Sequence, residues 1–152
     1  MNESLTILLP VFNGQATLAA RVASALESAA ELCPQFEVAI VDDGSTDETE
    51  EIACDLAIRF PQVHVARHHT RRGIAACIDT GMKTTHGTIV IVERSDEAPS
   101  SAELRRLWAS ATGEGTEGDE MSAKGAPGSA TVVARLMKWG QAVRETHARR
   151  DA

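Results

Sequence analysis

The sequence predicts an α/β protein in which helices cover both faces of a mostly parallel sheet. Short apolar runs of β-forming residues alternate with longer stretches whose apolar residues recur at helical spacing. Hydrophobic residues make up 43% of the chain but aromatic residues only 3%, so Ala, Val, Ile and Leu must build the core. The length of 152 residues suits a single domain with a sizeable core.

The first strand and helix follow directly from the amino terminus. Leu5 to Leu9 is a continuous apolar run, and we expect Pro10 to end it. Asn13-Gly14 forms the turn into a helix that Cys33-Pro34 terminates. The apolar face of this helix consists of Leu18, Val22, Leu26, Ala29 and Leu32.

The second strand leads into a pair of carboxylates. Phe36 to Val41 contains an unbroken apolar run, which favours a strand buried on both faces of a parallel sheet, and Asp42-Asp43 follows at once. Gly44 permits a tight turn, and Ser45 with Glu48 has the form of a capping box. We therefore expect a helix from Thr46 to Phe60, with acidic residues in its first turn.

The same alternation continues to a fourth strand. Val63 to Ala66 is a short third strand, Gly73 to Thr85 is a helix, and Ile89 to Val92 is the fourth strand. Right-handed crossovers then place the strands in one sheet. A further helix follows a capping box formed by Ser100 and Glu103, and its apolar stripe consists of Leu104, Leu107, Trp108 and Ala111.

The carboxyl-terminal part differs in composition from the domain that precedes it. We assign residues 1–111 to the sheet domain and residues 112–130 to a Gly-rich acidic linker that lacks the apolar residues to fold. Residues 131–152 have the pattern of a basic amphipathic helix. This helix either docks on the domain or binds a protein partner or an anionic membrane surface.

Charge and cysteine spacing exclude several classes of protein. A formal net charge of -7 argues against nucleic-acid binding. Cys33, Cys54 and Cys77 have no CxxC spacing and are odd in number, so we expect buried free thiols and neither a disulfide framework nor a zinc site. No apolar run approaches the ~20 residues of a membrane span, and we expect a soluble cytoplasmic protein.

Three separated motifs resemble those of one enzyme family. They are the strand and turn Leu5–Asn13, the stretch Val41–Asp47, and Arg72-Gly73 followed by Ala75-Ala76 and Thr80-Gly81. In this order and spacing they look like the nucleotide-sugar-binding half of the family 2 glycosyltransferases. The resemblance covers about residues 4–108 and implies the Rossmann-like GT-A fold of that family, with a nucleotide sugar as ligand.

The resemblance assigns ligand-binding roles to particular positions. Pro10, Phe12 and Asn13 would lie along the nucleotide, and Gly73 would let the backbone approach the diphosphate at a helix N-terminus. Two positions depart from the family, which often has Asn where Arg71 and Asp79 stand.

The resemblance gives the carboxylate pair the task of reading the base. Asp43, with Asp42 beside it, would accept a hydrogen bond from the base, typically a uracil or guanine N–H. A carboxylate suits this task because it discriminates against bases that lack the donor. The alternative is that both residues only form the turn, through Asx-type hydrogen bonds to the backbone.

The end of the fourth strand departs from the family pattern. Members usually carry Asp-x-Asp there, whose carboxylates hold Mn²⁺ or Mg²⁺ against the diphosphate. This chain has Arg94-Ser95-Asp96, so Asp96 is the remaining metal ligand, Glu93 or Glu97 could substitute, and we expect weak metal dependence. Arg94 could instead offer fixed positive charge to the diphosphate.

The resemblance leaves two functions open. Inverting members take their general base and acceptor pocket from the half after this motif, which is here a Gly-rich segment and one helix. The chain is therefore either a glycosyltransferase that transfers sugar from a nucleotide-diphosphate donor to an unknown acceptor, or a non-catalytic derivative that binds a nucleotide or a protein. We assign no general base.

Overall fold

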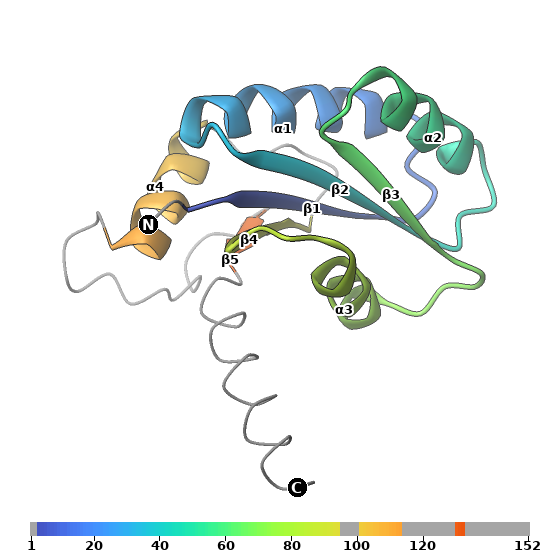
Figure 1. Ribbon diagram of the computed structural model, residues 1–152. Helices are drawn as coiled ribbons and strands as arrows, with labels where there is room; N and C mark the ends of the chain where they lie inside the picture. Colours follow the sequence, from blue (N-terminus) through green and yellow to red (C-terminus); the bar gives the residue numbers. More distant parts are fainter. Residues whose placement is uncertain (1–2, 95–100, 114–129, 133–152) are drawn as a thin grey trace, which may run out of the picture.

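The computed structural model describes residues 3–94, 101–113 and 130–132, and its elements alternate as the sequence predicts (Figure 1). The strands are β1 (Leu5–Val11), β2 (Phe36–Asp43), β3 (Val63–His68), β4 (Ile89–Glu93) and β5 (Ala130–Val132). The helices are α1 (Leu18–Leu32), α2 (Thr49–Arg59), α3 (Ile74–Thr84) and α4 (Ser101–Thr112). None of the described helices is long and apolar enough to cross a membrane.

The strands form one sheet in the order β3-β2-β1-β4-β5. β1 pairs in parallel with both β2 and β4, and β2 pairs in parallel with β3. β5 runs antiparallel to β4 at the edge. The prediction of a mostly parallel sheet is therefore confirmed.

Helices cover both faces of this sheet, as predicted. α1, α2 and α4 lie on one face and α3 lies on the other, which Figure 1 shows with α1 and α2 above the sheet and α3 below it. The larger core contains Leu18, Leu56 and Leu104 from the three helices on the first face. On the second face, α3 packs very closely, because a Cβ atom added at Gly81 would lie 2.6 Å from Cδ2 of Leu8 in β1.

The strand order creates a switch point between β1 and β4. The chain leaves β1 toward β2 and β3 on one side and returns to β4 on the other side. In open α/β sheets, ligands bind beyond the carboxyl ends of the strands at such a point. The residues that follow β1, β2 and β4 are therefore the ones to search for a site.

Several predicted boundaries are wrong by one to three residues, among them the end of β1 and the start of α2. β1 continues through Pro10 to Val11, because the pairing of β1 with β4 ends at Leu8 and the missing N–H of Pro10 interrupts no bond on that side. α2 begins at Thr49 instead of Thr46, and the side chain of its N-cap residue, Glu48, makes no capping hydrogen bond. The hydroxyl of Ser45 accepts a hydrogen bond from the backbone of another loop, so the expected capping box does not form.

The prediction of a helix that starts at Thr131 is also wrong. Thr131 and Val132 belong to β5 and pair with Val92 and Ile91 of β4. β-branched residues favour strands, since their side chains are restricted in a helix but pack well on a pleated sheet. Residues 114–129, the linker interior, and residues 133–152, the remainder of the predicted helix, lie outside the described part of the chain.

The three cysteines are free thiols, as expected. Cys33 and Cys77 are buried, but Cys54 is exposed on α2, so the prediction of burial is wrong for Cys54. α2 is amphipathic and Cys54 lies outside its buried residues, which are Thr49, Ala53 and Leu56.

Candidate functional site

Side-chain hydrogen bonds join the loops after β1 and β2. The amide of Asn13 donates to Oγ of Ser45 at 2.9 Å, and Oδ1 of Asn13 accepts from the amide of Thr46 at 2.8 Å. Asn13 has a φ of 51°, which Asn tolerates better than most residues. Asn13 therefore fixes one loop against the other, and its predicted contact with a nucleotide stays a prediction.

The loop after β2 also touches the loop between β3 and α3. Gly44 has a φ of +74°, and a Cβ atom there would lie 2.6 Å from the backbone nitrogen of Arg71 and 2.6 Å from the carbonyl carbon of Thr70. Only glycine satisfies both the positive φ and this backbone contact. The loops after β1, β2 and β3 thus meet at the carboxyl edge of the sheet.

Asp42 fulfils the structural role that the sequence left open. Its side chain is fully buried, and Oδ1 accepts a hydrogen bond from the amide of Ser45 at 3.0 Å, which closes the turn. Oδ2 lies 3.6 Å from Nε of Arg67, which is an ion pair but too long for a hydrogen bond. A contact between Asp42 and a nucleotide stays a prediction, but the turn accounts for this carboxylate.

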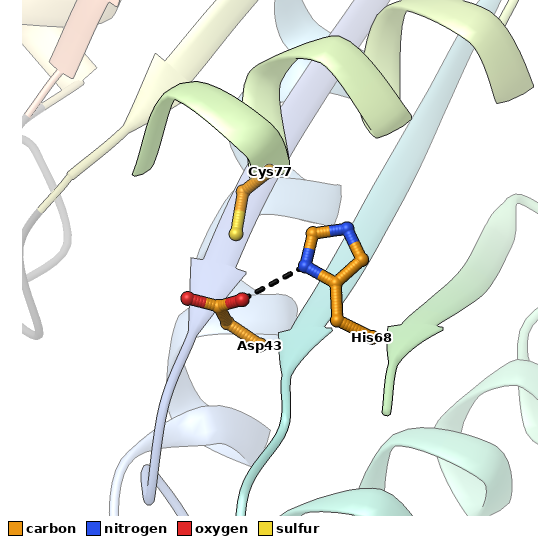
Figure 2. A group of neighbouring side chains, drawn as sticks. All are labelled: Asp43, His68 and Cys77. Atoms are coloured by element: carbon orange, nitrogen blue, oxygen red, sulfur yellow. Dashed lines mark hydrogen bonds and ion pairs between the residues drawn. The ribbon is translucent and has the colours of Figure 1, made fainter. Parts of the chain in front are cut away.

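Asp43 accepts hydrogen bonds from two other segments of the chain. The amide of Arg72 donates to Oδ1 at 2.8 Å, and the amide of Gly73 donates to Oδ2 at 2.9 Å. The Nδ1 atom of His68 lies 2.8 Å from Oδ1 (Figure 2). These contacts fix the carboxylate between the end of β3 and the start of α3.

The hydrogen bonds keep Asp43 ionised. Burial alone would raise the pKa of this carboxyl, but the bonds from Arg72, His68 and Gly73 outweigh it and hold the pKa below the usual value. Burial, together with the charge of Asp43, raises the pKa of the Cys77 thiol to about 12. The site thus combines a carboxylate that only accepts hydrogen bonds with a protonated thiol.

His68 and Thr80 are site residues that the sequence analysis missed. Nε2 of His68 lies 2.7 Å from Oγ1 of Thr80 in α3, while Nδ1 faces Asp43. The register pairs Asp43 of β2 directly with His68 of β3. Extending the third predicted strand from Ala66 to His68 would have placed this histidine beside Asp43.

Asp43, His68 and Cys77 also contain the donor types that zinc prefers, within 4.8 Å of one another. Their spacing does not suit an ion, however. Two ligands of a tetrahedral zinc lie about 3.3 Å apart, since each bond is about 2.0 Å long, whereas Nδ1 of His68 and Oδ1 of Asp43 are 2.8 Å apart. The cluster is a hydrogen-bond network (Figure 2).

Phe12 and Arg71 form a partly exposed stacked pair near this network. The guanidinium of Arg71 lies 4.0 Å from the ring centroid of Phe12, and Phe12 is 37% exposed. Arg71 immediately precedes the residues whose amides bind Asp43. The pair therefore offers an aromatic and cationic surface at the same edge of the sheet.

The remaining predicted binding residues differ in how accessible they are to a ligand. Pro10 is half-buried in β1. Gly73 has a φ of +95° and an open space where a Cβ atom would stand, so a ligand can approach its backbone. Its N–H already donates to Asp43, which leaves that group committed in this structure.

The end of β4 does not present a metal site among the described residues. The Glu93 side chain is fully buried, and neither of its carboxylate oxygens has a hydrogen-bond partner. Burial raises the pKa of Glu93 to about 7. Arg94 is exposed and brings a positive charge, and Asp96 lies outside the described residues. The described part of this strand end therefore does not fit a divalent cation.

A family model described as Glycosyl transferase family 2 matches residues 6–129. The chain belongs to this glycosyltransferase family. Among curated relatives, it is 29% identical over 103 residues to the uncharacterized glycosyltransferase EpsJ of Bacillus subtilis. It is 29% identical over 106 residues to the polyprenol monophosphomannose synthase of Mycolicibacterium smegmatis.

Two solved structures share the fold of this family 2 chain. The mannosyltransferase PcManGT from Pyrobaculum calidifontis, in complex with GDP-Man and Mn²⁺, superposes on 72% of the chain with a TM-score of 0.62 at 23% identity. TarS 1-349 from S. aureus superposes on 73% of the chain with a TM-score of 0.60 at 22% identity. The Rossmann-like GT-A fold is thereby confirmed.

The family 2 chain is short beside these proteins. The matches cover 68% of this chain but 29% of EpsJ, and 66% of this chain but 38% of the polyprenol monophosphomannose synthase. The shares of PcManGT and TarS 1-349 are 33% and 32%. The chain thus spans about a third of the length of these relatives.

Proposed function

We propose that this family 2 chain binds a nucleoside-diphosphate sugar at the carboxyl edge of the sheet, with Asp43 accepting a hydrogen bond from the base. One observation carries the proposal. Asp43 is ionised and fixed by hydrogen bonds from Arg72, Gly73 and His68, so it is a prepositioned acceptor for a base N–H. Uracil and guanine have such a donor on the ring, whereas the ring nitrogens of cytosine and adenine that face the pairing edge are acceptors.

Other residues at the same edge suit the rest of the ligand. The ring of Phe12 and the guanidinium of Arg71 are planar groups on which a base can stack. Pro10 lies near the end of β1 and Asn13 in the loop that follows it. The open backbone at Gly73 precedes α3, whose N-terminus favours phosphate. PcManGT was solved with GDP-Man and TarS 1-349 with UDP-GlcNAc, which supports a nucleotide sugar as the ligand class.

A metal is a weaker part of the proposal. PcManGT was solved with Mn²⁺, but in this chain Arg94 stands at the first position of the motif and Glu93 is enclosed. We therefore assign the neutralisation of the diphosphate to Arg94, with Asp96 as a residual ligand for Mn²⁺ or Mg²⁺.

Transfer of the sugar is the activity that family membership favours over a purely binding role. The acceptor and the general base are left unassigned, because the chain spans about a third of the relatives it matches. Nucleotide binding is the step that this chain itself can test.

Isothermal titration with UDP, CDP, GDP and ADP tests base reading directly. UDP and CDP are nearly isosteric, but only UDP has an N–H at ring position 3. We expect UDP to bind more tightly than CDP, or GDP to bind more tightly than ADP. Asp43→Asn should weaken the binding of the preferred nucleotide by about 1–3 kcal/mol, because a donor replaces one acceptor oxygen.

Asp79→Asn is the matched control, since it removes the same charge from the exposed face of α3, where Asp79 pairs with Lys83. It should leave binding unchanged. Equal affinity for UDP and CDP and for GDP and ADP would remove base reading from Asp43. Absence of binding by every nucleotide would overturn the whole proposal.

A further inference from the structure

The two oxygens of Asp43 are not equivalent. Among the described residues, two N–H donors reach Oδ1, namely the amide of Arg72 and Nδ1 of His68. One N–H donor, the amide of Gly73, reaches Oδ2. A carboxylate oxygen has two lone pairs, so the two N–H donors saturate Oδ1. Oδ2 has one N–H donor and retains capacity for a further strong donor, since the Cys77 thiol that also hydrogen-bonds to Asp43 is only a weak one.

The protonation of His68 follows from this arrangement. An ionised carboxylate only accepts hydrogen bonds, so Nδ1 must carry the proton that it shares with Asp43. Nε2 lies 2.7 Å from the hydroxyl of Thr80 in α3, which can donate or accept. The carboxylate of Asp43 thereby selects the tautomer that points a donor at it, and Thr80 holds the ring from its other side.

We propose that His68, held by Thr80, is a positioning residue that saturates Oδ1 of Asp43 and leaves Oδ2 as the atom that reads the base. The inference rests on the proposed nucleotide site and adds a specificity-determining residue to it. Without the His68 donor, Oδ1 regains a lone pair, although the amides of Arg72 and Gly73 still hold the carboxylate. The free lone pair lets the site accept donors other than a ring N–H, such as the exocyclic amine of cytosine.

The side-chain chemistry of asparagine and phenylalanine separates positioning from packing. The amide nitrogen of Asn lies the same number of bonds from the backbone as Nδ1 of His, so His68→Asn keeps a donor for Asp43. His68→Phe keeps a ring of similar size but has no donor. Both variants lose the bond to Thr80, and comparing them therefore isolates the bond to Asp43.

The measurement is the ratio of the UDP and CDP dissociation constants, or of the GDP and ADP constants if purines bind. We expect His68→Asn to retain the ratio of the parent chain and His68→Phe to reduce it by roughly tenfold. Thermal unfolding of each variant checks that it is folded. If His68→Phe does not fold, Thr80→Val supplies the comparison, because it removes the hydroxyl that holds the His68 ring in place beside Asp43.

The outcomes separate this inference from the proposed function. If the parent chain discriminates between the bases and folded His68→Phe or Thr80→Val does so equally well, His68 does not position Asp43. If the parent chain binds no nucleotide, the proposed function itself has failed. Addition of cobalt(II) covers the remaining possibility. A thiolate charge-transfer band that disappears in Cys77→Ser would make the cluster a metal site and overturn the inference.

Discussion

A buried carboxylate stands at the carboxyl end of both β2 and β4, namely Asp43 and Glu93. Only the carboxylate of Asp43 accepts hydrogen bonds from its surroundings. At the end of β2, Asp43 accepts three hydrogen bonds, and its pKa is lowered. At the end of β4, neither oxygen of Glu93 has a hydrogen-bond partner, and its pKa is raised to about 7. The two groups therefore depend on pH in opposite directions.

This difference follows from the neighbouring backbone more than from burial. Asp43 faces free N–H groups at the start of α3, which a carboxylate can accept. Arg21 lies near Glu93, but its Nη2 donates to the backbone oxygen of Glu93 at 3.3 Å and not to the carboxylate. Burying a carboxylic acid costs little free energy where loop amides donate hydrogen bonds to it, and much more where they do not.

The largest expected effect tests how the end of β2 is built. Gly44→Ala should destabilise the fold by roughly 3–5 kcal/mol, because alanine is strained at a φ of +74° and its Cβ would overlap the backbone of Thr70 and Arg71. Gly73→Ala is the matched control, with a φ of +95° but no atom within 4 Å of the added Cβ. With a ψ of 172°, Gly73 lies in a region that essentially only glycine adopts, so this variant should cost only the backbone strain, about 1–3 kcal/mol.

Chemical denaturation of both variants measures the difference. Equal losses of unfolding free energy for Gly44→Ala and Gly73→Ala would mean that the contact between the two loops contributes nothing. In that case the end of β2 would be no more tightly built than an ordinary loop.

An intermediate effect is expected at the end of β4. The unfolded chain releases the proton of Glu93 near pH 4.5 and the folded chain near pH 7, so the folded state loses stability as the pH rises between these values. Glu93→Gln stays neutral and removes this loss. At pH 8 it should stabilise the fold by up to about 3 kcal/mol, and at pH 4 it should have little effect.

Unfolding of the parent chain and the variant at both pH values checks this prediction. Glu51→Gln, on the exposed surface of α2, removes the same charge without burial and should change stability little at either pH. A Glu93→Gln variant that is less stable than the parent at pH 8 would mean that the carboxylate has a stabilising partner.

The smallest effect on stability, but an informative one for binding, is expected at Arg94. Because this side chain is exposed, Arg94→Asp should change the unfolding free energy by no more than about 0.5 kcal/mol. It restores the Asp-x-Asp pattern and removes a repelling charge, so it should increase Mn²⁺-dependent binding of a nucleotide sugar. Titration with and without Mn²⁺ measures this change. Strong Mn²⁺ dependence already in the parent chain would contradict the prediction.

Much of the sheet was predictable because its inner strands are unbroken apolar runs. β2 and β4 are buried along most of their length, and such runs are recognisable without knowledge of their partners. β5 was not recognised, since Thr131 and Val132 also fit the apolar spacing of a helix. Only pairing with β4 decides between the two patterns.

The candidate site was predictable in position but not in detail. The motif located the carboxylates at the end of β2, yet adjacent residues of a strand point to opposite faces. The sequence alone therefore could not separate Asp42, which closes a turn, from Asp43, which binds the loop before α3. His68 was missed for a related reason, because its role depends on the register between β2 and β3.

The close packing of Gly81 against Leu8 has a consequence for motion. Sliding α3 along the sheet by one turn would bring the side chain of Ile78 or Thr84, which lie on the same face of the helix as Gly81, onto the Leu8 methyl groups, where a single added Cβ already overlaps. A shear of this helix is therefore sterically blocked. Among the described residues that hold Asp43, an adjustment on ligand entry would then come from the segment between His68 and Gly73, with α3 as a fixed support beneath it.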